Sequence, residues 1–200
     1  MKYYIDHRIE PAYSSYRLLE ADSCALSTYQ MQGPFEVIAR LGVNKHTKRP
    51  SEDDHKAAYL NALMWTLTGD EAHARKSIEI LNAYSAMLKL IGPNDNDDPL
   101  CASLQGSMLA NAAELIKHTY SKVTPAEIAG WEKMLRTVFI PVLDTFFKAK
   151  PYTNGNWGAA ATKAYMAFGI FLEDEALYNQ AVHFLSLIHI SEPTRRVVIS

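Results

Sequence analysis

Three segments of the chain carry apolar or small residues on almost every side of a helix. They read AAYLNALMW from residue 57, CASLQGSMLANAAE from residue 101 and WGAAATKAYMAFGIF from residue 157. A helix that is apolar all round needs neighbours on all sides, whereas the segment that follows each of these has one charged side. The pattern therefore predicts helical hairpins, each with a buried inner helix and a half-exposed outer helix.

The outer segments of the first and third hairpins also open alike, with GDEAHARKSIEIL at residue 69 and EDEALYNQAVHFL at residue 173. A weak internal repeat of helical hairpins is typical of an α/α toroid or solenoid. We therefore predict an all-α fold, an incomplete (α/α) toroid built from helical hairpins. An irregular helical bundle is the alternative that periodicity leaves open.

Capping residues predict where the first two of these helices begin and end. Ser51 is a candidate N-cap, followed by acidic residues in the first turn, and this helix should stop near Gly69. Asp70 should cap the next helix, which Gly92 and the proline after it should end.

The later helices have similar signals. A third helix is expected over residues 99–120, and a fourth begins at TPAE, where Thr124 and Glu127 fit a capping box around Pro125. Pro141 should kink or end that helix. The last two helices are expected over residues 159–171 and from residue 174 onward.

Composition excludes several classes of protein. A formal net charge of -2 gives no electrostatic case for binding nucleic acid or an anionic membrane. Cys24 and Cys101 form no metal-binding spacing, and neither do His55, His73 and His118. No apolar run is long enough for a membrane span, and the N-terminus MKYYIDHRIEPAYSSY lacks the apolar region of a signal peptide. We expect no metal and no cofactor.

The last sixteen residues, 185–200, differ from the rest of the chain. Their first part, LSLIHI followed by SEPTR, is what the transposon mosaic end and adaptor of sequencing libraries encode when translated in one frame. We therefore expect residues 185–200 to be a translated adaptor that belongs to no domain, and we exclude them from fold reasoning. An ordinary proline-containing tail is the alternative.

The loop YTNGNWG, residues 152–158, carries the clearest chemical signal. Two asparagines flank a glycine and precede Trp157 at the start of an apolar helix. Amide donors neutralise a carboxylate without adding a competing charge, and an indole face stacks on a sugar ring. The alternative is a plain Asn-Gly turn in which Trp157 seals the core.

The motifs ALMWTLTGD, NAAE and NGNW, in this order, resemble the alginate lyase superfamily of helical polysaccharide lyases over residues 12–184. The resemblance implies an (α/α) toroid, cleavage of uronic-acid polysaccharides such as alginate or glucuronan by β-elimination, and an extracellular or periplasmic location. The expected domain covers residues 1–184. By resemblance the whole protein is a carbon–oxygen lyase, and this chain is a C-terminally truncated fragment expected to be inactive.

Site residues follow from the same resemblance. It implies that Asn154 and Asn156 contact the substrate carboxylate and that Trp157 supports the site or stacks on sugar. A base, commonly His or Tyr, takes the proton on carbon 5, and an acid, commonly Tyr, protonates the leaving oxygen. Classical members carry an Asn-His pair where this chain has Gly-Asn-Trp, so the base is unassigned. The family's later Tyr, Arg and His would follow residue 184.

Other residues are weaker candidates. Tyr59, Trp65 and Gln105 lie on expected inner helices and either line a substrate groove or belong to the core. Two further functions remain open: a non-catalytic helical glycan-binding or scaffold protein on the same fold, and a glycoside hydrolase with two acids across a groove. The acids available for the latter are Asp53, Asp54 and Glu114.

Overall fold

A computed structural model describes residues 1–92, 97–149 and 155–191. The described part is mostly helical, which confirms the all-α prediction. In chain order the elements are α1 (Lys2–Asp6), α2 (Ala12–Glu20), η1 (Ser23–Ala25), β1 (Val37–Ile38), η2 (Lys45–Thr47), α3 (Lys48–Thr68), α4 (Glu71–Met87), β2 (Leu90–Ile91), α5 (Asp98–Thr119), α6 (Pro125–Met134), η3 (Leu135–Phe139), α7 (Ile140–Ala149), α8 (Asn156–Phe171) and α9 (Glu175–Ser191). The strands β1 and β2 form one short parallel pair.

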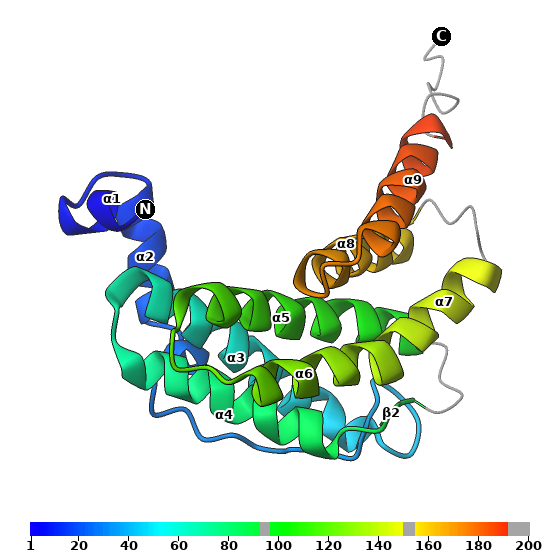
Figure 1. Ribbon diagram of the computed structural model, residues 1–200, viewed down its shortest axis with the longest axis horizontal. Coiled ribbons are helices and arrows are strands. Elements are labelled where there is room, and N and C mark those ends of the chain that lie inside the picture. Colours follow the sequence, from blue (N-terminus) through cyan, green and yellow to red (C-terminus); the bar gives the residue numbers. More distant parts are fainter. Residues whose placement is uncertain (93–96, 150–154, 192–200) are drawn as a thin grey trace, which may run out of the picture.

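The helices α3, α5 and α8 form an inner row in chain order (Figure 1). They run in the same direction, because the C-terminal ends of neighbours meet: Trp65 Nε1 of α3 donates to Thr119 Oγ1 of α5 at 2.9 Å, and Lys117 of α5 reaches the carbonyl oxygen of Phe171. Outer segments cover this row, with α4 on α3, the α6–η3–α7 segment on α4 and α5, and α9 on α8. The predicted pairing of inner and outer helices is thus present.

Small residues let the inner row pack closely. A Cβ atom on Gly106 of α5 would lie 2.7 Å from side-chain atoms of both Phe139 and Phe168, so only glycine fits between these rings. Alanines fill much of the remaining inner face of α5, and Ala102, Ala110 and Ala113 are all buried. Close backbone approach therefore explains why the inner segments look apolar or small on most sides.

Several predicted caps are confirmed. Gly69 ends α3 in the left-handed region at φ 75°, and Asp70 accepts a hydrogen bond from the Ala72 backbone N–H at 2.9 Å. Thr124 and Glu127 form the predicted capping box at the start of α6. Asp70 and Thr124 satisfy N–H groups that have no partner within a helix, and the Gly69 N–H donates to the Trp65 carbonyl at the end of α3, so local sequence determines these helix boundaries.

Two predicted boundaries were wrong. Helix α3 begins at Lys48 and not after Ser51, which is buried within the helix and donates to the Lys48 carbonyl oxygen at 3.2 Å. Pro50 is tolerated there because the first turn of a helix has no N–H partners to lose. Helix α4 ends at Met87, because Lys89 and Leu90 donate backbone hydrogen bonds to Glu36 and the chain enters β2.

The effect of Pro141 is local. A π-helical stretch, η3, precedes it, and Pro141 is the second residue of α7, so the chain resumes an α-helix across the proline. A proline lacks the N–H that would continue the ladder of hydrogen bonds, and a wider turn accommodates its ring. At the other end of the chain, α9 runs to Ser191 and so continues into residues 185–200, whose adaptor origin stays a prediction.

A buried carboxylate anchors the segment that precedes α3. Asp54 is fully buried and accepts four hydrogen bonds, from the Tyr29 and Tyr84 hydroxyls at 2.8 Å each and from the backbone N–H groups of Gln32 and Gly33 at 2.9 and 2.8 Å. Burial raises the pKa of both tyrosines, so both hydroxyls stay protonated and can donate. One side chain thus joins the loop, α3 and α4.

The side chain of His55, the next residue, is fully buried in the core. Its ring meets Tyr84 edge to face at a centroid distance of 4.3 Å, and neither ring nitrogen has a partner among the described residues. Burial lowers the pKa of His55 to about 3, and the neighbouring Gln105 side chain acts in the opposite direction. His55 is therefore neutral at physiological pH.

The Asp54 anchor predicts a local effect of Asp54→Ala. Four donors, among them the buried Tyr84 hydroxyl, would lose their acceptor, which costs about 3 kcal/mol and corresponds to roughly a hundredfold faster hydrogen exchange of the Gln32 and Gly33 amides. Asp53→Ala is the matched control, because Asp53 pairs with the exposed Arg49 side chain and its loss should change exchange little. Equal exchange in both variants would contradict the anchor.

His55 predicts acid sensitivity. In the unfolded chain its pKa is near 6.5 and in the folded chain about 3, so unfolded molecules bind more protons between these values. Stability should therefore fall as the pH drops from 6.5 toward 3, by roughly 3 kcal/mol at pH 4. Between pH 7 and pH 4, the urea midpoint of unfolding should fall less in His55→Gln than in the parent chain. The exposed-site control His118→Gln should show the same fall as the parent chain.

Candidate functional site

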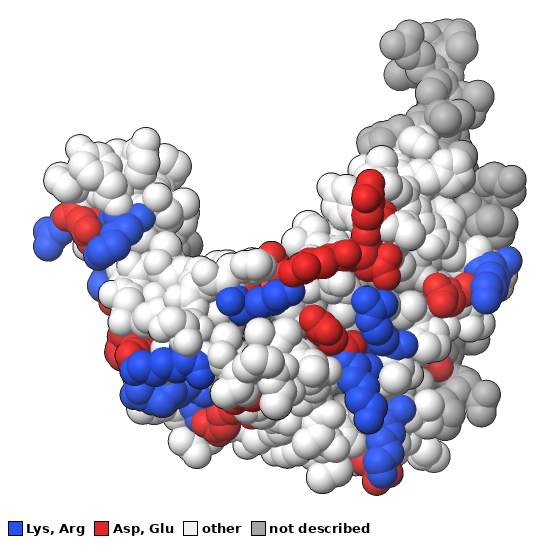
Figure 2. Space-filling model, viewed as in Figure 1, with Lys and Arg blue, Asp and Glu red and all other residues white. Residues whose placement is uncertain are grey.

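The inner row borders an open hollow. Figure 2 shows it on the upper side of the molecule, between α1–α2 on the left and α8–α9 on the right. Helix α5 forms its floor with its one open face, where Leu104, Met108, Asn111 and Leu115 recur at helical spacing and are exposed or half-buried. These four residues carry no charge, so they offer apolar contact and one amide, and the charged groups Glu114 and Lys117 lie toward the C-terminal end of the helix.

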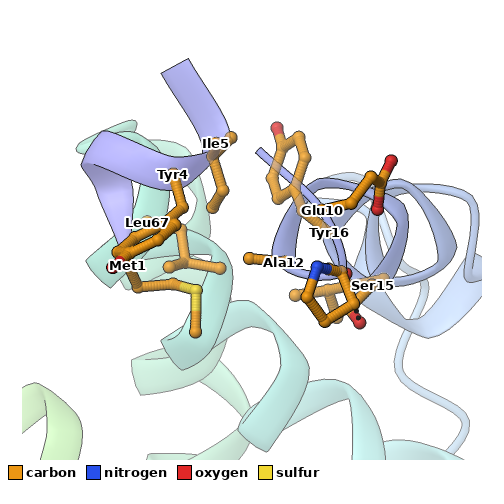
Figure 3. A pocket seen from close by; sticks show the side chains of 10 residues that line it. Met1, Tyr4, Ile5, Glu10, Ala12, Ser15, Tyr16 and Leu67 are labelled. Atoms are coloured by element: carbon orange, nitrogen blue, oxygen red, sulfur yellow. Dashed lines mark hydrogen bonds between the residues drawn. The ribbon is translucent and has the colours of Figure 1, made fainter. Parts of the chain in front are cut away.

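The arm formed by α1 and α2 contains no buried residue. Between it and the end of α3 lies a pocket of about 470 Å³ (Figure 3), in which Met1, Tyr4, Ile5 and Leu67 face residues of α2. The hydroxyl of Tyr16 donates to Glu20 within the arm at 3.2 Å, and the pocket lining includes Glu10 but no Lys, Arg or His side chain. An apolar pocket of this kind does not suit an acidic sugar.

The predicted asparagine and tryptophan residues lie at the start of α8. Asn156 is its first residue and is exposed, and Trp157 is half-buried against the core. Asn154 lies outside the described residues. The first N–H groups of α8 have no partner within the helix and carry the positive end of its dipole. The side-chain amide, the first backbone N–H groups of the helix and the helix dipole together favour a carboxylate at this end.

Lys163 shares the open face of α8. It follows Asn156 by seven residues, which is two turns and roughly 10 Å along the same side of the helix. Asn156, Ala159, Lys163 and Ile170 are all exposed, and the Lys163 ammonium has no ion pair within the described residues. Lys163 was not among the residues predicted from the sequence, although its spacing of seven from Asn156 would have indicated it.

The other predicted contact residues lie elsewhere. Trp65 lies near the C-terminal end of α3, with its ring edge to face on Tyr120 at 5.3 Å, whereas Asn156 begins α8 at the opposite end of the row. Gln105 is fully buried, and its amide lies 3.4 Å from the Cys101 sulfur. Tyr59 is half-buried on α3. The structure thus brings Asn156 and Trp157 together, and substrate contact by the other three stays a prediction.

Two contacts from α7 position α8. The Tyr165 hydroxyl of α8 donates to the Asp144 carboxylate, and the Phe147 ring lies 5.0 Å from the Tyr165 ring. Phe147 also stacks on Phe184 of α9 at 3.9 Å. Burial raises the pKa of Tyr165, which keeps its proton on the bond to Asp144. The helix that begins with Asn156 is therefore held by two contacts from α7.

The acids considered for glycoside hydrolysis have structural partners. Asp53 pairs with Arg49, Asp54 accepts its four hydrogen bonds, and Glu114 lies 3.3 Å from His118. Among the described residues no three His, Cys, Asp or Glu side chains gather as a metal site would require. Nor does any helix in this part of the chain have the length and apolar character of a membrane span.

Comparison with known proteins identifies the family. The sequence profile of the family described as alginate lyase matches residues 31–189, which is most of the chain. Neither the curated proteins nor the solved structures yield a match. The matched region includes α3 to α8 and with them Asn156 and Trp157. This chain belongs to the alginate lyase family.

Proposed function

We propose that this protein is a polysaccharide lyase that cleaves a uronic-acid polymer such as alginate or glucuronan by β-elimination. The observation that carries the proposal is the exposed Asn156 amide at the positive end of α8, in a chain that belongs to the alginate lyase family. Family membership supports the reaction class. The amide supplies a hydrogen-bond donor to the substrate carboxylate, which that reaction needs first.

The chemistry explains why a neutral donor is suited to this place. The proton on carbon 5 of a uronic acid leaves only when the adjacent carboxylate is neutralised, because the carbanion otherwise forms next to a full negative charge. We assign the carboxylate contact to Asn156, with Asn154 and the free N–H groups of α8 beside it. Lys163 then binds a second carboxylate of the same polymer, and Trp157 stacks on a sugar or supports the loop.

The remaining catalytic groups belong to the proposal as well. A base removes the carbon 5 proton, and an acid protonates the glycosidic oxygen as its bond to carbon 4 breaks. We assign both to Tyr and His residues of a continuation after residue 184, in place of residues 185–200. Such a continuation adds hairpins to the inner row and completes an (α/α) toroid around the hollow. A polymer substrate of this kind places the protein outside the cytoplasm.

A second candidate function is non-catalytic glycan binding on the same fold. It is favoured by one departure from the pattern that the resemblance implies: this chain has Gly-Asn-Trp, residues 155–157, in the loop where an Asn-His pair is expected. A protein without a base would bind the acidic polymer at the same amides and release no product. The two functions differ in whether unsaturated sugar, detected by its ultraviolet absorbance, accumulates.

The site predicts the behaviour of Asn156 variants of the full-length protein. Asn156→Ala should lower kcat/KM on glucuronan or alginate by roughly a hundredfold, the size expected for one lost donor to a developing charge. Asn156→Asp, of nearly equal size, should lower it at least as far because it sets a second negative charge against the carboxylate. Full activity in both variants would rule out this residue. Binding by the parent protein without unsaturated product would favour the second candidate function.

Lys163 predicts a different kinetic change. Lys163→Met should raise KM for long polymer several-fold and leave kcat nearly unchanged, because this contact holds the substrate equally before and during reaction. Lys45→Met is the matched control, since Lys45 is exposed on η2, away from α8. A drop in kcat at unchanged KM would show that Lys163 acts differently from this assignment.

A further inference from the structure

A second groove lies on the outer layer, away from the hollow. It has a volume of about 560 Å³ and runs between the last turn of α4 and the α6–η3 segment. Its lining consists of Ser85, Ala86, Leu88, Lys89, Gly130, Lys133, Met134, Thr137 and Val138. A volume of this size holds a small molecule of one or two sugar rings.

The charged lining is entirely basic. Lys89 and Lys133 are the only charged residues that line the groove, and Lys133 is exposed without an ion pair in the described part of the chain. Lys89 pairs with Glu36 at 2.9 Å, but both side chains are mostly exposed, so the pair is weak. Arg136 follows Lys133 by one turn and reaches Asp174. Figure 2 shows Lys and Arg side chains in a column over α6 and the end of α4.

The uncharged polar groups of the groove are acceptors. The Ser85 hydroxyl donates to the Asn82 carbonyl at 3.0 Å and the Thr137 hydroxyl to the Lys133 carbonyl at 2.8 Å, which leaves the lone pairs of both oxygens available. The last turn of α4 also ends in carbonyl groups without helical partners, at the negative end of its dipole. A bare anion such as phosphate is disfavoured at such an end.

A sugar acid matches this combination. Its hydroxyl groups donate to the carbonyl and hydroxyl oxygens, its carboxylate pairs with Lys133, and the C–H face of its ring covers the apolar floor formed by Leu88, Met134 and Val138. A neutral sugar has no charged group to pair with the Lys133 ammonium. A phosphate lacks the several hydroxyl groups that would donate to the carbonyl and hydroxyl oxygens of the groove. The groove therefore selects for a carboxylate on a polyhydroxylated ring.

We propose that this groove is a secondary binding site for uronic-acid residues of the polymer, distinct from the site at Asn156. The inference rests on the proposed function for its substrate class. The groove lies on the outer layer, whereas Asn156 belongs to the inner row. The groove therefore performs no chemistry and instead holds the polymer near the enzyme. A second contact on the same polymer raises the effective concentration at the first.

The test is an amide chemical-shift titration of the full chain with a glucuronate tetrasaccharide. Gly130 and Thr137 report on the groove, and Trp157 and Gly158 report on α8. Lys133→Met should weaken binding at the groove reporters at least tenfold and leave the α8 reporters unchanged. Asn156→Ala should weaken binding at the α8 reporters and leave the groove reporters unchanged. The exposed-lysine control Lys45→Met should match the parent chain at both places, and circular dichroism checks that each variant is folded.

Each outcome decides a different claim. Saturable shifts at Gly130 and Thr137 that Lys133→Met abolishes support the groove, even where Trp157 and Gly158 do not respond and the site at Asn156 fails. Shifts confined to α8 overturn the groove alone. Equal binding of inorganic phosphate, or of a neutral glucose tetrasaccharide, at the groove overturns the assignment to a sugar acid.

Discussion

The arrangement of this chain depends on one buried carboxylate. Asp54 fixes the loop around Gln32 and Gly33 against α3 and α4, and the chain continues from this loop into β1. Two residues beyond β1, Arg40 lies 2.6 Å from Glu52 of α3 and 3.3 Å from Asp97 before α5. The anchored segment thus ties the starts of two inner helices, α3 and α5, together.

The position of the candidate site follows from packing further along the row. Gly106 allows Phe168 of α8 to approach the backbone of α5, and Asp144 and Phe147 hold α8 from the outer side. These contacts aim the first turn of α8 outward, with Asn156 exposed. A loop residue on a rigid helix end is a suitable place for a group that must meet a substrate carboxylate repeatedly in the same geometry.

Local sequence determined those parts of the fold that depend on local hydrogen bonds. Caps such as Asp70 and Thr124 bond within three residues of their own position, so their side chains alone predicted the helix starts. Ser51 misled the prediction because the contacts that bury it come from the surrounding fold. Asp54 looked like an ordinary first-turn acid, since its partners lie 21 to 30 residues away in the chain.

The same limit applies to the sites. Asn156 and Trp157 stood out because their residue types cluster within one loop, whereas Lys163 required knowing which face of α8 is open. The groove at Lys133 could not be predicted at all, because its two walls come from α4 and α6–η3 and meet only in the folded chain. A formal net charge of -2 also conceals a surface on which basic residues gather locally.

In the function that we propose, neutral donors at α8 and cations farther away play different parts in binding an acidic polymer. Cations attract the chain over distance but depend on salt, whereas amides at a helix start act at one atom and only at contact. This division makes the substrate carboxylate, and not the sugar ring, the group on which reaction depends. The central claim is therefore that cleavage requires neutralisation of that carboxylate by the amides at the start of α8.

The most direct measurement compares two polymers that differ only in this group. The full-length protein is incubated with glucuronan and with the same polymer after reduction of its carboxylates to primary alcohols, and unsaturated product is followed by ultraviolet absorbance. The account predicts product from the native polymer and none from the reduced one. Cleavage of the reduced polymer at a comparable rate would contradict it, because no carboxylate would then remain for the Asn156 amide to neutralise.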